Sequence, residues 1–376
     1  MIEIREVASK RDMKKFCNFP LDLYKGNKNY CPPLYGDEVA LFDPNKTGIY
    51  GDYTDTKFFM AYKDGKLVGR LAALINHAYI EKWGDKCGRF TRFDVIDDYE
   101  VTEALFDRAV AYFKENGLNR VQGPMGYNDI DREGMLVEGF DYPACYGSSY
   151  NFAYYKDHVE RYGFEKQVDW LEWRLDRPTE PNEKLNKVAE LVQKKYNFHD
   201  LIDNNSSINK LLKQYGKRIF DLLDTAYSKL HGTVPLTDKF VDNMLSFVGL
   251  LLDPKYTSVI ADENDNIIAV GVCLKGIWKA LNKCKGKLLP FGWLTLLKAA
   301  MTTNEIEFAL IGVLPEYQKT GVHAMVMARI TENIRNSNLQ ALETNAVLEG
   351  NLMMRNQWMG YPGIQHKRKR CNVKEI

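Results

Sequence analysis

The sequence predicts an α/β protein built from two similar units in tandem, each a mixed central β-sheet flanked by helices. Three observations support this prediction. The chain has 376 residues, more than one ordinary hydrophobic core accommodates. Its composition, 45% hydrophobic and 27% charged, is that of a globular protein. The order hairpin, strand, helix, strand, helix, strand is found in each half, as an internal duplication would produce.

The first half begins with the alternating strand pattern of residues 2–7 and continues with helical pieces. A hairpin is expected at 57–75, because Asp64-Gly65 is a strong turn signal between two β-rich runs. Residues 123–150, rich in Gly, Asp and Tyr, are expected to form a long loop. The other expected elements are strands at 88–96, 120–125 and 170–175 and helices at 101–117 and 150–164.

Residues 176–184 contain two prolines and five charges, which indicates a linker between the units. We therefore place the domains at 1–178 and 181–376. In the second half the pattern predicts helices at 208–230 and after Thr237, a hairpin at 257–274, an insertion at 275–304, a strand at 306–313, a helix at 321–336, a strand at 339–347, a short helix at 350–359 and a last strand near 366–373.

Charge and cysteine content exclude several classes of protein. The net charge is +1, so nothing in the bulk composition attracts nucleic acid. The seven cysteines include no CxxC pair, which argues against a disulfide framework or a metal site. The N-terminus lacks the apolar core of a signal peptide, and the longest apolar run, 288–297, is half a membrane span. We expect a cytoplasmic protein with no transmembrane segment and no metal.

One stretch combines a buried strand with a helix start suited to an anion. The apolar run to Val313 is followed by a turn and by residues 318–323, which open a helical pattern. Unpaired N–H groups and the helix dipole favour an anion at such a place, and Gly321 would let the backbone approach it closely. The alternative is an ordinary strand-to-helix turn. Neither a Walker A loop nor a dinucleotide fingerprint is present.

This stretch resembles the acyl-CoA signature of the GNAT acetyltransferase superfamily, Gln/Arg-x-x-Gly-x-Gly/Ala. Gln318 and Gly321 match, whereas His323 stands where the family usually has Gly or Ala. Residues 339–361 look like the family's next strand and helix. The resemblance implies a cofactor, acetyl-CoA or another acyl-CoA, bound by Ile311, Gly312, Val313, Gln318, Lys319, Thr320, Gly321, Val322, His323, Ala324 and Asn351.

By element order the resemblance extends to 1–178, so the whole chain is similar to a tandem GNAT protein. The first unit departs from the pattern, because its strand 88–96 runs into the helix without a glycine or a Gln/Arg-x-x-Gly motif. Asp97, Asp98 and Glu100 place negative charge where a pyrophosphate would bind, and like charges repel. We expect a degenerate cofactor site in the first unit and one cofactor per chain.

Two residues are candidates for the chemistry of acyl transfer, which needs a deprotonated amine and a proton for the leaving thiolate. Histone-type GNAT enzymes carry a general base at the position that matches Glu307, so the resemblance implies this role; the alternative is a solvent-facing glutamate. The family's thiolate-protonating tyrosine is replaced by Asn356, which cannot release a proton at neutral pH. Water, Tyr361 or a residue of the other unit are alternatives.

Three further segments are candidates for function. The loop 123–150 and the helix after it hold many tyrosines, and we expect the loop to border an acceptor pocket between the units. The basic run 366–370 is interpreted as a solvated edge strand. The insertion 275–301 is rich in lysine and apolar residues. We expect it to dock at the cleft between the units; a lid over the pocket and contact with an anionic membrane are alternatives.

The function predicted from these observations is transfer of an acyl group from acyl-CoA to an amine of a small molecule or peptide. A non-catalytic acyl-CoA sensor with the same fold is the first alternative, because the usual tyrosine is missing. An aminoacyl-tRNA-dependent transferase is the second, since some peptidoglycan-bridge ligases also pair two such units. The near-neutral charge argues against tRNA as a partner.

Overall fold

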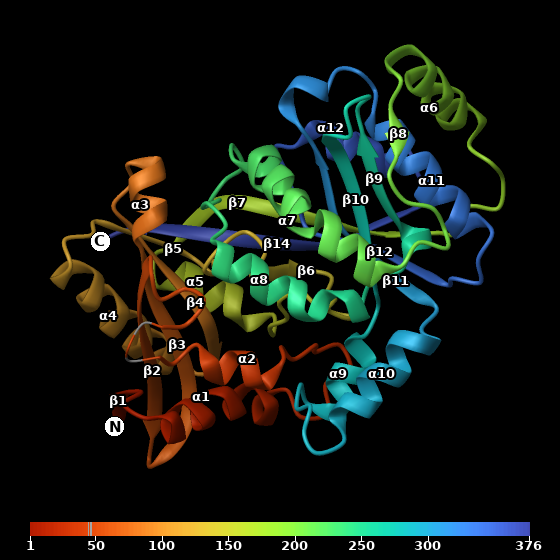
Figure 1. Cartoon of the computed structure of the whole chain (residues 1–376). Helices are drawn as coiled ribbons and strands as arrows, with labels where there is room; N and C mark the ends of the chain where they lie inside the picture. Colours follow the sequence, from red (N-terminus) through yellow and green to blue (C-terminus); the bar gives the residue numbers. More distant parts are fainter. Residues whose placement is uncertain (44, 46) are drawn as a thin grey trace.

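The computed structural model describes residues 1–43, 45 and 47–376. The first half of the chain contains both strands and helices (Figure 1). The elements of this half are β1 (Ile2–Glu6), α1 (Lys10–Leu23), α2 (Tyr35–Ala40), β2 (Thr54–Lys63), β3 (Lys66–Asn76), α3 (His77–Trp83), β4 (Cys87–Val95), α4 (Tyr99–Glu115), β5 (Arg120–Gly123), β6 (Met135–Glu138), α5 (Tyr154–Arg161) and β7 (Glu165–Leu175).

The second half repeats the order of elements. It comprises α6 (Glu183–Tyr196), β8 (His199–Asp200), α7 (Ile208–Tyr227), α8 (Asp238–Phe247), the 3₁₀ turns η1 (Val248–Leu250) and η2 (Pro254–Tyr256), β9 (Thr257–Ala261), β10 (Ile267–Lys275), α9 (Trp278–Cys284), α10 (Gly292–Thr302), β11 (Glu305–Val313), η3 (Pro315–Tyr317), α11 (His323–Arg335), β12 (Ala341–Thr344), β13 (Val347–Leu348), α12 (Leu352–Met359) and β14 (Gly363–Glu375).

Local sequence signals explain many of these elements. The turn between β2 and β3 is formed by Asp64 and Gly65, which both have positive φ, 52° and 77°, as a type I′ hairpin turn requires. Thr237 caps α8, since its side chain accepts a hydrogen bond from the Phe240 N–H at 3.2 Å. Sequence reasoning missed α3, α6 and the short strands β6 and β8, and it treated 135–138 as part of a loop.

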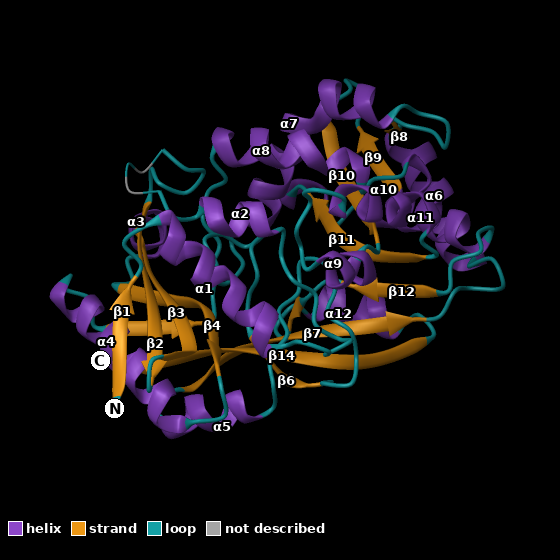
Figure 2. Cartoon of the chain, turned by 90° about the horizontal axis from the view of Figure 1, so that it is seen from below, coloured by secondary structure: helices purple, strands orange, loops and turns teal. Residues whose placement is uncertain are grey.

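The strands form one sheet that continues through both halves, in the order β1-β2-β3-β4-β5-β14-β7-β12-β11-β10-β9-β8. The last strand of the chain, β14, lies between β5 and β7 of the first half and pairs antiparallel with both. Figure 2 shows the long strands β14 and β7 side by side in the middle of the molecule. The two halves therefore exchange strands, and each completes the other's sheet.

The interpretation of residues 366–370 as a solvated edge strand is wrong. These residues belong to β14, which has a paired neighbour on both sides. His366, Lys367 and Lys369 are buried there, because successive residues of a central strand face two covered sides of the sheet. Their charges meet acidic partners instead of water.

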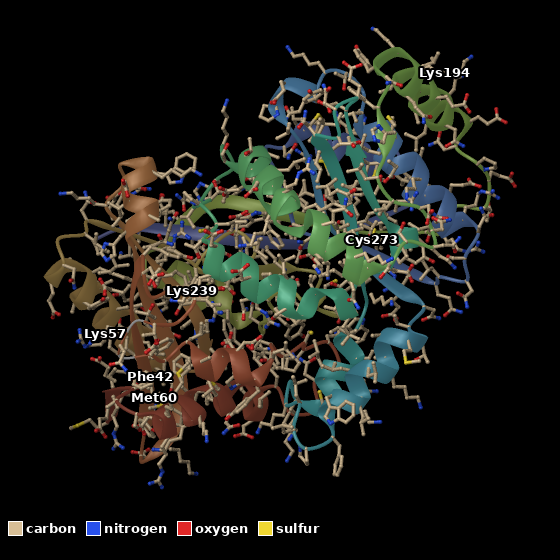
Figure 3. All side chains as sticks on the ribbon, in the orientation of Figure 1. Phe42, Lys57, Met60, Lys194, Lys239 and Cys273 are labelled. Atoms are coloured by element: carbon tan, nitrogen blue, oxygen red, sulfur yellow. The ribbon has the colours of Figure 1, made fainter. Side chains whose placement is uncertain are left out.

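The halves also touch through side chains. Phe220 and Phe240 of the second half pack with Ile49 and Tyr50 of the first half. Figure 3 labels Lys239 on α8, whose ammonium lies 3.7 Å from the carboxylate of Asp52. These contacts hold α8 against the first half of the chain.

The insertion docks against the first half, as expected from the sequence. Ala280 and Leu281 of α9 pack with Cys31 and Ala144. The Asn282 side chain donates hydrogen bonds to the carbonyl oxygens of residues 27 and 30, at 3.1 and 2.6 Å. In Figure 1, α9 and α10 lie at the lower right, beside α2.

Candidate active site

Two parallel strands of the second half separate where the predicted motif begins. β11 pairs with β12 only over Glu305–Phe308 and Ala341–Thr344. β11 then continues to Val313 along β10, while β12 ends. A bulge in the β10–β11 pairing, between Val272 and Cys273, bends the strand at this point. The split leaves one edge of β11 without a strand partner, next to the start of α11.

The loop between β11 and α11 has the properties that an anion site needs. Gly321 has a φ of +87°, a conformation that glycine adopts without strain. In the chain as described, the backbone N–H groups of Lys319, Gly321 and His323 donate to no acceptor. Gln318, Lys319 and His323 are exposed, and Thr320 caps its own turn by bonding to the Tyr317 carbonyl. The loop can therefore offer several N–H donors to one phosphate group.

The remaining predicted cofactor residues have mixed environments. Val322 and Ala324 are buried, so only their backbones are able to face a ligand. Gly312 lies under α7, where an added Cβ would be 2.9 Å from Leu222. Asn351 is the N-cap of α12, and its side chain accepts from the Met354 N–H at 3.2 Å.

A tyrosine that sequence reasoning missed occupies the open edge of β11. The Tyr227 hydroxyl, from the end of α7, accepts from the Ile311 N–H at 3.1 Å and donates to the Ile311 carbonyl at 3.0 Å. The Tyr227 hydroxyl thus occupies both the N–H and the carbonyl of Ile311, the residue that would face a ligand where β11 and β12 separate. No local signal distinguishes Tyr227 from a core tyrosine in the sequence.

The matching place in the first half is filled by the chain itself. Asp98 caps α4 by accepting from the Glu100 N–H at 3.1 Å, and Lys63 lies 2.6 Å from its carboxylate. The hydroxyls of Tyr154 and Tyr155 bond to the carbonyl and the N–H of Val95, at 2.7 and 2.9 Å. A carboxylate at the helix start and aromatic rings in the split leave little room for an acyl-CoA.

A cavity of about 750 Å³ lies between the two halves. Its apolar wall comes from both, and Figure 3 labels Phe42 of the first half among these residues. The apolar side chains include Leu41, Phe42, Ile49, Tyr50, Phe58, Tyr112, Phe220, Phe240, Met244, Phe247, Val248, Val272, Leu274 and Leu310. The predicted bordering loop contributes Tyr127, 129–132 and 145–147, so this part of the pocket expectation agrees with the structure.

The polar part of the cavity wall is mainly acidic. Among the described lining residues, the acids are Glu6, Asp37, Glu38, Asp43, Asp55, Asp129, Asp131 and Glu307, and the cations are Lys57, Arg92 and Arg132. Arg92 is held by Glu38 at 3.0 Å and Asp131 at 2.6 Å. Burial raises the pKa of Asp129 to about 6. Negative charge therefore exceeds positive charge around this space.

Glu307 lies in the same wall, on β11 before the strand splits from β12. It is 7% exposed, so the alternative of a solvent-facing glutamate is wrong. Both carboxylate oxygens lie 3.3 Å from the Tyr146 N–H. Burial raises the pKa of Glu307 to about 8, although the Tyr146 N–H and Lys367 favour the ionised form. This pKa suits a group that exchanges protons near neutral pH.

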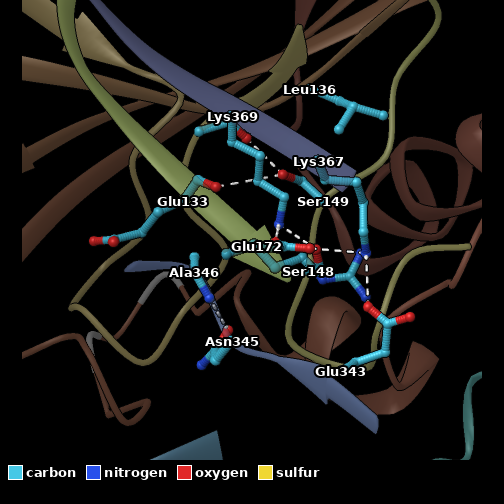
Figure 4. Close-up of polar contacts among 12 residues, drawn as sticks. Glu133, Leu136, Ser148, Ser149, Glu172, Glu343, Asn345, Ala346, Lys367 and Lys369 are labelled. Atoms are coloured by element: carbon cyan, nitrogen blue, oxygen red, sulfur yellow. Dashed lines mark hydrogen bonds and ion pairs between the residues drawn. The ribbon is translucent and has the colours of Figure 1, made fainter. Parts of the chain in front are cut away.

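Behind Glu307 lies a buried network of charges on β7, β12 and β14 (Figure 4). Glu172 is bound by Lys367 at 2.8 Å and by Lys369 at 2.7 Å, and Lys369 also contacts Ser148. His366 lies 2.8 Å from Glu343. Burial opposes ionisation of Glu172, but the two lysines outweigh it and keep its pKa well below the usual range.

The strand exchange builds this network, because the cations come from the last strand and the acid Glu172 from the end of the first half. Lys367 also reaches toward Glu343, 3.9 Å away, and its charge acts on Glu307. Sequence reasoning missed the network, since Glu172 and the lysines of β14 lie far apart in the sequence and meet only in the folded sheet.

Asn356 is not near this cavity wall. It lies on the exposed side of α12, and it is absent from the residues that line the cavity. Tyr361 packs instead against Trp358, with 6.1 Å between ring centroids, and burial raises its pKa to about 12. The catalytic role of Asn356 stays a prediction.

Within residues 1–43, 45 and 47–376, no three His, Cys, Asp or Glu side chains are grouped so as to hold a metal ion. Over the same residues, no helix has the length and apolarity needed to cross a bilayer.

Comparison with known proteins gives relatives over the whole length of the chain. No protein-family model matches. Protein YghO of Escherichia coli is 29% identical over 383 residues, covering 99% of this chain and 95% of that protein. The bacterial ceramide synthase of Caulobacter vibrioides is 24% identical over 392 residues, covering 100% and 98%.

Solved structures match the fold. A tandem GNAT protein from the clavulanic acid biosynthesis pathway has a TM-score of 0.52 at 11% identity, with 100% of this chain and 98% of that chain covered. A probable N-acyltransferase from Enterococcus faecalis has a TM-score of 0.51 at 8% identity, with 100% and 73% covered. The chain has a tandem GNAT fold with a mixed sheet, as the sequence predicted.

Proposed function

We propose that the protein is an acyl-CoA-dependent N-acyltransferase whose acceptor is an amphiphilic amine bound in the cavity between the halves. The observation that carries this proposal is the position of Glu307, a buried carboxyl group in the wall of a cavity of about 750 Å³. Its proton equilibrium near neutral pH is what a general base for amine attack requires.

The acyl donor is assigned to the split between β11 and β12 and to the loop before α11. The free N–H groups at Lys319, Gly321 and His323 would bind its pyrophosphate. The acyl-bearing arm would follow the edge of β11 toward Glu307, in exchange for the Tyr227 hydroxyl at Ile311. Acetyl-CoA and longer acyl-CoA molecules share these contacts.

The acceptor class follows from the cavity. Excess acidic side chains suit a cationic amine, and the long apolar wall suits a hydrocarbon chain. The relative named bacterial ceramide synthase supports this choice, because a ceramide is a long-chain amine carrying an acyl group on nitrogen. A peptide acceptor is less consistent with a space whose walls, from both halves, are largely apolar.

The reaction balances with these groups. Glu307 removes a proton from the amine, and the nitrogen attacks the thioester carbonyl carbon. A C–N bond forms, the C–S bond breaks, and the thiolate leaves with a proton from solvent or from protonated Glu307. The products are an amide and the free thiol of CoA. We place the reaction in the cytoplasm, where acyl-CoA is available.

A panel of amines tests the proposal. Release of the CoA thiol is measured with acetyl-CoA and palmitoyl-CoA in the presence of a sphingoid base, an alkylamine, a polyamine or a lysine peptide. We expect turnover with the long-chain amines. Turnover only with the polyamine or the peptide would contradict the acceptor class, and saturable acyl-CoA binding without turnover on any amine would favour the sensor interpretation.

A further inference from the structure

The insertion between β10 and β11 exposes a group of large apolar side chains. Leu289 is 82% exposed, Phe291 71% and Met301 77%. Contiguous apolar patches of this kind on a protein surface usually mark a contact with a membrane or another molecule. We call this group the α9–α10 surface; its apolar members are Leu288, Leu289, Phe291, Trp293, Leu294, Leu297 and Met301.

The α9–α10 surface is the outer face of a segment whose inner face is already used. Leu296 and Ala300 of α10 are buried, and Leu281 of α9 packs on the first half. Trp293, Leu297 and Met301 recur every four residues along α10 and form an exposed stripe next to the buried Leu296 and Ala300. Docking of the inner face on the first half therefore leaves the outer face uncovered. The segment can pack on the first half and make a second contact through its outer face at the same time.

The same segment is strongly basic. Residues 275–304 contain no Asp or Glu, and their lysines are at positions 275, 279, 283, 285, 287 and 298. Lys279 is paired with Glu305 of the next strand. Lys283, Lys285 and Lys298 are exposed, and within the described chain none of the three makes an ion pair. Positive charge beside exposed Leu, Phe and Trp matches the chemistry of an anionic lipid surface.

The position of the segment connects it with the cavity. Leu34 and Leu274 line the cavity and also belong to the cluster in which α9 is packed. The segment that would contact a bilayer through its outer face thus packs, on its inner side, against residues that line the apolar space between the halves. This arrangement would give an amphiphilic ligand a short path from the bilayer to the cavity. A polar partner protein would have no use for such a path.

We propose that the α9–α10 surface docks on anionic phospholipid bilayers, with Leu289, Phe291 and Trp293 inserted among the lipid chains and the lysines at the headgroups. The docking is peripheral and does not depend on acyl transfer. It adds a membrane partner to the protein, and its failure would leave the proposed reaction unchanged.

Co-sedimentation with vesicles tests the docking. The full chain is mixed with vesicles of phosphatidylcholine alone or with added phosphatidylglycerol. We expect binding to the anionic vesicles that falls as salt rises from about 0.1 M to about 0.5 M, since shorter Debye lengths screen the lysines. Equal binding to both vesicle types, or no binding to either, would overturn the proposal.

Matched variants locate the contact. Leu289→Asp/Phe291→Asp should lower vesicle affinity at least about tenfold, because two apolar insertions are lost. Leu352→Asp/Met353→Asp, which alters a similarly exposed pair on α12, should leave it unchanged. Equal losses in the two variants would contradict a specific surface. Circular dichroism confirms that both remain folded.

A second pair of variants tests how much the lysine charges contribute to vesicle binding. Lys283→Glu/Lys285→Glu should weaken binding about tenfold or more. Lys187→Glu/Lys194→Glu, on the distant helix α6 where Figure 3 shows Lys194 pointing outward, makes the same change in net charge and should have little effect. Sedimentation velocity without lipid tests whether a second copy of the chain binds this surface. If the protein forms a dimer and Leu289→Asp/Phe291→Asp dissociates it, the surface belongs to a second copy and the membrane contact is overturned.

Discussion

Replacing Glu307 with Gln should change the pH dependence of stability in a predictable direction. In the folded protein burial raises the pKa of this carboxyl to about 8, above its ordinary value of 4.5. The folded state therefore binds a proton that the unfolded state releases as pH rises above 4.5. The contribution of this carboxyl to wild-type stability then falls with rising pH until the folded carboxyl also ionises near pH 8. Glutamine has the same shape and does not titrate, so the variant lacks this loss.

The size of the effect follows from the pKa difference. Each unit of difference corresponds to about 1.4 kcal/mol, so between pH 5 and pH 8 the variant should gain roughly 3–4 kcal/mol relative to wild type. At pH 5 and below, both proteins carry an uncharged side chain here and should differ little. The Gln amide can still accept the hydrogen bond from the Tyr146 N–H.

Urea unfolding at several pH values measures this gain. The difference in free energy of unfolding between the variant and wild type should grow steadily from pH 5 to pH 8 and then level off. Glu316→Gln, an exposed carboxyl in the turn after β11, controls for the loss of one negative charge and should show no such growth. A constant difference across this pH range would refute a raised pKa and with it the assignment of Glu307 as a base near neutral pH.

Three other substitutions test separate parts of the account. Gly321→Glu should abolish acyl-CoA binding in calorimetry, because its carboxylate would occupy the anion site; Gly321→Ala, which shares the backbone strain, should retain measurable binding. Tyr227→Phe should lower the free energy of unfolding by about 1–3 kcal/mol, since both polar groups of Ile311 lose their partner, and an unchanged value would contradict this. Lys367→Met should lower the free energy of unfolding by about 1.5–3 kcal/mol, because Glu172 keeps Lys369 but loses one of its two buried cations. Lys367→Arg retains the charge and should lose less; equal losses in the two variants would refute the pairing.

The elements with strong local signals were predictable from the sequence. The hairpin at Asp64-Gly65 and the helix after Thr237 depend on neighbouring residues, so their turn and cap chemistry identifies them. The strand, loop and helix around Gly321 were predictable for the same reason, and the resemblance then supplied Glu307. Helix α6 was missed although its signals are local: Asn182 caps its start, and Leu185, Val188, Ala189 and Val192 recur at helical spacing.

Features that depend on distant pairing were not predictable. The pattern of β14 fits an edge strand as well as a central one, and only its pairing with β5 and β7 decides which. The same pairing creates the network of Glu172, Lys367 and Lys369. The pairing of β14 with β5 and β7 also affects the predicted domains 1–178 and 181–376. A cut between these domains would remove β14 from the sheet of the first half. The boundaries remain predictions, and binding studies need the full chain.

Product analysis tests the central claim most directly. The full-length protein is incubated with isotope-labelled palmitoyl-CoA and a sphingoid base, and the N-acyl product is quantified by mass spectrometry against released thiol. The account predicts a labelled amide in a one-to-one ratio with CoA, and a loss of roughly 10²-fold or more in Glu307→Gln. Absence of the amide in the wild-type protein, or an equal rate in Glu307→Gln, would contradict an N-acyltransferase centred on Glu307.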